Sequence, residues 1–133
     1  MPEEAIETQE VLSLQLNIPV QISDLRDIFS TATCYIHYWC HISNKTENIA
    51  KLIKLDDYTE RLPENKDDYE IFEVTPEFIL LGIQRLLSGD VKVNKQIYGW
   101  LSSAMATGDM GMIDVTVADC IMQAACFNEL VYS

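Results

Sequence analysis

The side chains best suited to chemistry interrupt the last apolar stretch of the chain, residues 113–132. Thr116, Asp119 and Gln123 stand at positions i, i+3 and i+7, which puts them within about 60° of one another around a helix. The surrounding helical positions are apolar, and a carboxylate or an amide is costly to bury without hydrogen-bond partners. Three interpretations stay open: a narrow strip facing solvent, a buried network in which Asp119 accepts hydrogen bonds from residues 35–43, and a ligand pocket.

Cysteine and histidine side chains, which are common metal ligands, form a second group. Its members are Cys34, His37, Cys40, His41, Cys120 and Cys126. On an extended strand Cys34 and Cys40 point to the face opposite the two histidines, and on a helix Cys120 and Cys126 diverge. We therefore expect no metal and no cofactor, and interpret these residues as buried thiols and aromatic packing.

Signals for catalysis are missing from the sequence. It has no glycine elbow, no helix-start cysteine and no phosphate-binding loop, and the cluster Gly108–Gly111 lacks the basic residue of such a loop. A metal-dependent hydrolase built on Asp114, Asp119 and Glu129 would need tertiary convergence, because these carboxylates do not share one helical face. We expect a protein that is not an enzyme.

Net charge is the strongest bulk signal. The 133 residues carry a formal charge of -12, which repels nucleic acids and anionic membranes and attracts basic proteins. Acidity also keeps proteins soluble, so the charge alone does not establish a partner. No apolar stretch reaches the roughly 18 residues of a membrane span, and the N-terminus has no signal-peptide core. We expect a cytoplasmic protein without membrane or direct nucleic-acid contact, built as an acidic arm (1–10) and a single globular domain (11–133).

Strand and helix patterns alternate in the first half of the chain. Leucines alternate with polar residues over Val11–Ile18, which favours a half-buried strand. Ser23 is placed to cap the helix that follows. The buried face of that helix is expected to be Leu25, Ile28, Phe29 and Ala32. Tyr35–Ser43 and Tyr69–Val74 have the composition of strands, whereas the apolar island Ile49–Leu55 fits a strand or a helix.

Three helices are expected in the second half. Thr75, with a proline after it, begins the first, and Gly89 ends it. The second spans Asn94 to about Ala106, and Asp114 caps the third. Glu129–Tyr132 is predicted to close the chain as a short strand. This order favours an α+β fold, a small antiparallel or mixed sheet packed with about four helices.

Three blocks of sequence together resemble a family. They are Ile22-Ser-Asp-Leu-Arg-Asp-Ile28 leading into Tyr38-Trp39-Cys40, the stretch Val74-Thr-Pro-Glu-Phe-Ile-Leu-Leu-Gly82, and Asp114-Val-Thr-Val-Ala-Asp119 followed by Gln123, Phe127, Glu129 and Val131. Covering a little over a third of the chain, they are similar to uncharacterised small proteins of bacteriophages and related mobile elements. Members of that family carry an Ile-x-Asp-Ile helix, a Gly-Gly-x-x-Tyr-Trp strand and a terminal Asp-Ala-x-Thr-Ala-Asp-x-x-x-Gln-x-x-x-Phe-Gly-Glu-x-Val block.

The resemblance implies a phage or mobile-element origin and names no reaction. The family's shared polar and aromatic positions correspond here to Tyr38, Trp39, Asp114, Thr116, Asp119, Gln123 and Glu129. Two departures concern glycine: the family's Gly-Gly is Cys34-Tyr35 in this chain, and the glycine before Glu129 is Asn128. A ligand role that required glycine at 34–35 is therefore not implied.

Two functions follow as hypotheses. The first is a non-enzymatic, phage-type binding protein that occupies a host protein in the host cytoplasm. Such an acidic inhibitor binds a basic or nucleic-acid-binding defence complex with carboxylates in the positions where that complex binds phosphates. The candidate surface includes the charged segment Glu60–Glu73. The alternative is a protein that sequesters a signalling nucleotide, with Tyr38 and Trp39 stacking on the base and Asp119 and Gln123 reading its edge. The sequence leaves the oligomeric state open.

Overall fold

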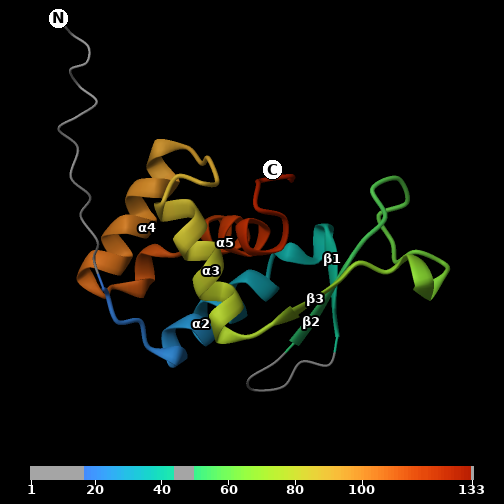
Figure 1. Cartoon of the computed structure of the whole chain (residues 1–133), viewed down its shortest axis with the longest axis horizontal. Coiled ribbons are helices and arrows are strands. Elements are labelled where there is room, and N and C mark those ends of the chain that lie inside the picture. Colours follow the sequence, from blue (N-terminus) through green and yellow to red (C-terminus); the bar gives the residue numbers. More distant parts are fainter. Residues whose placement is uncertain (1–16, 44–49, 133) are drawn as a thin grey trace, which may run out of the picture.

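A computed structural model describes residues 17–43 and 50–132 (Figure 1). The described residues form four α-helices and a three-stranded antiparallel sheet. The helices are α2 (Ile22–Thr33), α3 (Pro76–Leu87), α4 (Lys95–Thr107) and α5 (Val115–Phe127), and the strands are β1 (Cys40–Ser43), β2 (Ala50–Lys54) and β3 (Ile71–Val74). The predicted α+β fold is confirmed. The predicted arm (1–10) and most of the predicted strand Val11–Ile18 lie outside the described residues.

The sheet is a simple meander with the strand order β1-β2-β3. Its register places Ile42 opposite Leu52 and Leu52 opposite Phe72, and these apolar side chains belong to or pack against the hydrophobic core. On the other face, His41 and Ile71 are exposed. The apolar island that the sequence left open is therefore strand β2, because pairing on both sides satisfies its backbone groups.

Helix α5 lies at the centre of the fold and packs closely against α3 (Figure 1). The two backbones approach at Gly82, where an added Cβ would lie 2.2 Å from the carbonyl oxygen of Ile121. Arg85 of α3 then donates through Nη1 to the carbonyl oxygens of Ala124 and Ala125, at 3.0 and 2.9 Å. The bond to Ala125 satisfies an acceptor that the end of a helix would leave without a partner, whereas the carbonyl oxygen of Ala124 also accepts from the backbone N–H of Asn128.

Side-chain caps set the starts of three helices, as the sequence predicted for two of them. Thr75 accepts a hydrogen bond from the backbone N–H of Phe78, and Asp114 accepts one from that of Val117. Asn94 caps α4 in the same way, although the sequence predicted it as part of the helix. The predicted cap at Ser23 is wrong by two residues: α2 begins after Gln21, without a side-chain cap bond. Among the described residues, no helix is long and apolar enough to cross a membrane.

The segment between β2 and β3 extends beyond the end of the sheet, away from the helices (Figure 1). We call residues 55–70 the acidic projection, because they carry seven acidic and two basic side chains. All of these acids except the half-buried Asp56 are exposed. A 3-10 turn over Lys66–Asp68 is its only helical element.

Candidate functional site

Asp119 is the centre of a hydrogen-bonded network on the inner side of α5. Only 5% of the residue is exposed. Its Oδ2 accepts a hydrogen bond from the Tyr38 hydroxyl at 2.6 Å, and its Oδ1 accepts from Trp39 Nε1 at 2.9 Å and from Gln123 Nε2 at 3.0 Å. Three donors from two separate segments thus satisfy the buried carboxylate, which is the condition for burying a charge at acceptable cost.

Both aromatic donors reach Asp119 because residues 36–38 form a 3-10 turn. The sequence predicted one strand over Tyr35–Ser43, but only Cys40–Ser43 is extended, and Ile36–Tyr38 is 3-10 helical. Consecutive side chains of a strand point to opposite faces, so Tyr38 and Trp39 would diverge in the predicted strand. The turn places both phenol and indole on one carboxylate. The predicted strand faces do not apply to Cys34 and His37, which lie outside the strand. They hold for Cys40 and His41 on β1, of which Cys40 is buried and His41 exposed.

Gln123 uses every polar atom of its side chain. Besides Asp119, its Nε2 donates to the carbonyl oxygen of Tyr132 at 3.1 Å and approaches the Tyr38 hydroxyl at 3.4 Å. Its Oε1 accepts from the backbone N–H groups of Val131 and Tyr132 at 2.9 and 2.8 Å. The amide therefore binds the backbone of the C-terminal segment 128–132, which leaves α5 through the left-handed residue Asn128. The predicted strand Glu129–Tyr132 is wrong: a side chain, and no neighbouring strand, satisfies this backbone.

Aromatic rings enclose the network. The ring of Tyr132 is nearly parallel to that of Trp39, with 5.8 Å between centroids and 7° between planes. Phe127 contacts both, at 5.3 and 6.0 Å, and Tyr38 meets Tyr132 edge to face at 6.2 Å. Offset and edge-to-face contacts of this kind each stabilise a fold by about 0.5–1.5 kcal/mol beyond the area they bury.

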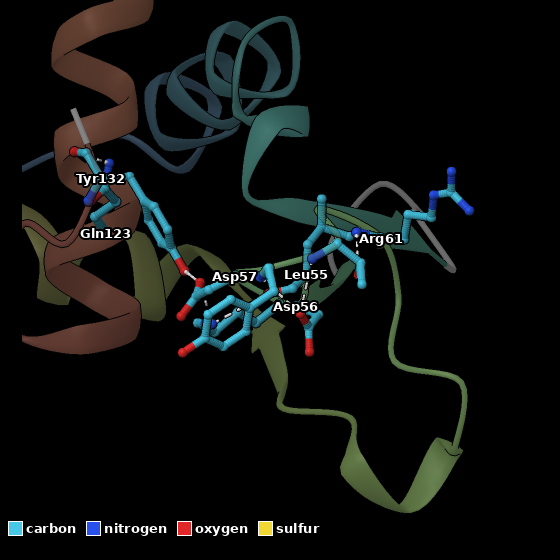
Figure 2. A network of polar contacts seen from close by, with 9 residues as sticks. Leu55, Asp56, Asp57, Arg61, Gln123 and Tyr132 are labelled. Carbon is cyan, nitrogen blue, oxygen red and sulfur yellow. Dashed lines mark hydrogen bonds and ion pairs between the residues drawn. The ribbon is translucent and has the colours of Figure 1, made fainter.

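Tyr132 extends the network to the acidic projection, as Figure 2 shows. Its hydroxyl donates to Asp57 Oδ1 at 2.8 Å, and Lys54 Nζ lies 3.0 Å from the same oxygen. The backbone N–H of Leu55 also donates to the carbonyl oxygen of Trp39 at 2.9 Å. The base of the projection is thereby joined to α5 through a continuous chain of polar contacts.

Asp56 fixes the loop that follows. Its Oδ1 accepts hydrogen bonds from the backbone N–H groups of Tyr58 and Thr59, at 2.8 and 3.1 Å. Its own N–H donates to the carbonyl oxygen of Arg61 (Figure 2), and its carbonyl oxygen accepts from Glu60. The loop presents Tyr58 with 96% of its surface exposed.

The protonation states of the site residues depend on how deeply their side chains are buried. Burial, and then the hydrogen bond to Asp119, raise the pKa of Tyr38, so its phenol stays protonated and donates. Burial likewise raises the pKa of Tyr132. The hydrogen bond from Tyr132, followed by that from Lys54, lowers the pKa of Asp57. Burial also raises the pKa of the Cys40, Cys120 and Cys126 thiols, that of Cys120 to about 11, so Cys120 is no thiolate nucleophile near neutral pH.

The structure brings together four of the seven predicted site residues. Tyr38, Trp39, Asp119 and Gln123 form the network, as one of the three interpretations of the polar stripe required. The other three, Asp114, Thr116 and Glu129, are exposed, and Asp114 serves as the cap of α5.

Sequence reasoning missed Lys54, Asp57 and Tyr132. Their only signal is charge or aromaticity near an uncertain segment, which does not indicate contact across 75 residues of chain. A pocket of about 300 Å³ lies at the base of the projection, between Lys54, Asp68 and Glu70. Within residues 17–43 and 50–132, no group of three His, Cys, Asp or Glu side chains could hold a metal ion.

Comparison with known proteins finds no relative, because no family model, no curated protein and no solved structure matches the chain.

Proposed function

We propose that this chain is a non-enzymatic, phage-type binding protein that occupies a host protein through its acidic projection. The partner is a basic or nucleic-acid-binding protein of a defence complex, and the site of action is the host cytoplasm. The resemblance to phage proteins supports the origin. The observation that carries the proposal is the projection itself, which holds seven of the 21 acidic side chains and a fully exposed tyrosine.

Charge favours a basic protein as the partner. Clustered carboxylates repel the phosphates of nucleic acid and speed association with a positively charged surface. Six of the acids in the projection are exposed, and only Arg61 and Lys66 offset them within it. Such a surface competes with nucleic acid for a basic groove.

Tyr58 supplies an anchor within this charged surface. Tyrosine is enriched among the residues that dominate binding energy at interfaces, because its ring buries a large area at small entropic cost. The bonds to Asp56 hold the loop in one conformation, so little ordering is left for the moment of binding. A partner with an aromatic-sized pocket rimmed by Lys or Arg fits this loop.

Nucleotide sequestration has less support. Trp39, expected to stack on a base, is 1% exposed, and its ring lies against Tyr132. The polar atoms of Asp119 and Gln123, expected to read the edge of a base, are hydrogen-bonded within the protein. These residues support the fold and leave no free edge for a ligand.

The test is affinity capture from a bacterial host lysate with two variants that lose the same amount of charge. The projection variant carries Glu60→Gln, Glu64→Gln and Asp68→Asn. The control variant carries Asp27→Asn, Asp90→Asn and Glu77→Gln. All six residues are exposed, and the two variants have equal net charge.

We expect the wild-type chain and the control to retain the same partner and the projection variant to lose it. Retention should weaken as salt is raised, since exposed charges are screened. Equal capture by both variants would contradict a role of the projection.

A further inference from the structure

Segment 128–132 is held in a way that differs from the rest of the fold. Within the described residues, no backbone-to-backbone hydrogen bond reaches residues 129–132. Two backbone N–H groups and one carbonyl oxygen of Val131 and Tyr132 pair with the amide of Gln123. An amide that both donates to and accepts from a backbone holds any extended segment, whatever its side chains.

A slot beside this amide, which we define by Trp39, Phe127 and Asp57, selects the side chain that the segment places there. Trp39 supplies a parallel face for one aromatic ring, Phe127 closes the side, and Asp57 accepts the phenolic hydrogen bond. The slot therefore fits an aromatic residue, and it favours tyrosine over phenylalanine. Backbone pairing for affinity with one aromatic pocket for specificity is a recurring arrangement in peptide recognition.

The segment that fills the slot is joined to α5 at a single turn and packs against the core through Leu130 and Tyr132. It leaves α5 at Asn128, a left-handed residue that ends the helix, so the segment can depart while α5 remains intact. Asn128, Glu129 and Val131 are exposed, and Leu130 and Tyr132 are only partly buried.

We propose that Gln123, Trp39 and Asp57 form a peptide-binding site that segment 128–132 occupies in cis, and that an extended segment of a partner protein replaces it. The incoming segment carries one aromatic residue whose own N–H and C=O pair with Gln123. Basic neighbours are favoured by the exposed acids of the adjacent acidic projection and by the net charge of -12. This site does not depend on the proposed function, because its contacts lie at the base of the acidic projection and not along it.

The test uses the full chain with Tyr132→Ala, which empties the slot and keeps the backbone. The probes are the synthetic peptides acetyl-Lys-Leu-Val-Tyr-Lys-amide and its analogue with alanine in place of tyrosine. The indole N–H resonance of Trp39 reports on the slot, because that group donates to Asp119 beside it. Trp100→Phe identifies this resonance, since the chain has two tryptophans.

We expect a saturable shift of the Trp39 resonance with the tyrosine peptide and binding at least about tenfold weaker with the alanine peptide. Adding Gln123→Met should abolish the shift. The projection variant should keep the preference for tyrosine, because the two peptides carry equal charge, and this separates the site from the proposed function.

No shift at millimolar peptide, equal shifts with both peptides, or binding that survives Gln123→Met would overturn the proposal. A dimer of the free protein that the peptide dissociates would also overturn it, since a second copy would then be the occupant. If Tyr132→Ala does not fold, Tyr132→Leu retains apolar bulk in the slot and gives the same comparison.

Discussion

Asp119→Ala tests whether the polar stripe stabilises the protein as an internal network. The substitution removes the acceptor shared by Tyr38, Trp39 and Gln123. Trp39 and Gln123 are each 1% exposed, so their donors do not reach water, whereas the Tyr38 hydroxyl belongs to a residue that is 39% exposed and can be hydrated. A buried donor left without a partner costs about 1–3 kcal/mol, so two such donors cost about 2–5 kcal/mol once the remaining bonds of Gln123 are considered.

Urea denaturation followed by circular dichroism measures this loss in the free energy of unfolding. Thr116→Ala is the control, because Thr116 is exposed one turn earlier on the same helix, and we expect a change within about 0.5 kcal/mol there. A loss below about 1 kcal/mol for Asp119→Ala would show that the buried donors find other partners, and the reasoning about this network would be wrong.

Three further perturbations test other parts of the structure. Gly82→Ala should destabilise the protein by about 1–3 kcal/mol, because the added methyl group meets the backbone of α5. Gly99→Ala, which places its methyl group in open space on α4, should stabilise the protein by up to about 1 kcal/mol. Thermal unfolding measures both changes. Tyr132→Phe removes the bond to the acidic projection and should speed trypsin cleavage after Arg61 about threefold to tenfold. The pKa of Tyr38 is raised from 10.0, so the folded state holds this proton more tightly than the unfolded state. Stability should therefore fall as pH rises above 10, and Tyr38→Phe should remove part of that dependence in alkaline denaturation.

Each of these three predictions has a control or a result that would contradict it. Equal effects of the two glycine substitutions would show that α3 and α5 do not approach as described. Tyr98→Phe removes a comparable exposed hydroxyl bond, to the carbonyl oxygen of Leu87, and should leave trypsin cleavage of the projection unchanged. An alkaline stability profile that is identical with and without the Tyr38 hydroxyl would place its protonation outside the folding equilibrium.

Local signals explain how much of the fold the sequence could predict. Thr75, Asp114 and the glycine after α3 act within one turn of the chain, and the predicted boundaries they define are confirmed. Residues 35–39 and Glu129–Tyr132 were predicted wrongly as strand because side chains outside these segments decide their conformation. Their donors bind Asp119 and Gln123 on α5, and strand propensity takes no account of such partners.

The candidate site could likewise be predicted only where the signal is local in the sequence. Spacing on one helix was enough to group Asp119 with Gln123, and the cost of burying them made a network with residues 35–43 one of three interpretations. Thr116 shares their spacing but lies where the helix meets solvent, which only packing determines. The bond between Tyr132 and Asp57 joins two stretches that lie 75 residues apart, and neither carries a pattern that indicates the other.

The most direct test of the proposed function is the affinity of the captured host partner for the wild-type chain, the projection variant and the charge-matched control. Isothermal titration at two salt concentrations measures all three. We predict that the projection variant binds about tenfold more weakly than the wild type at the lower salt concentration, and that the difference narrows at the higher one, because clustered exposed charges act together and are screened. Equal affinities for the two variants at both salt concentrations would contradict the account.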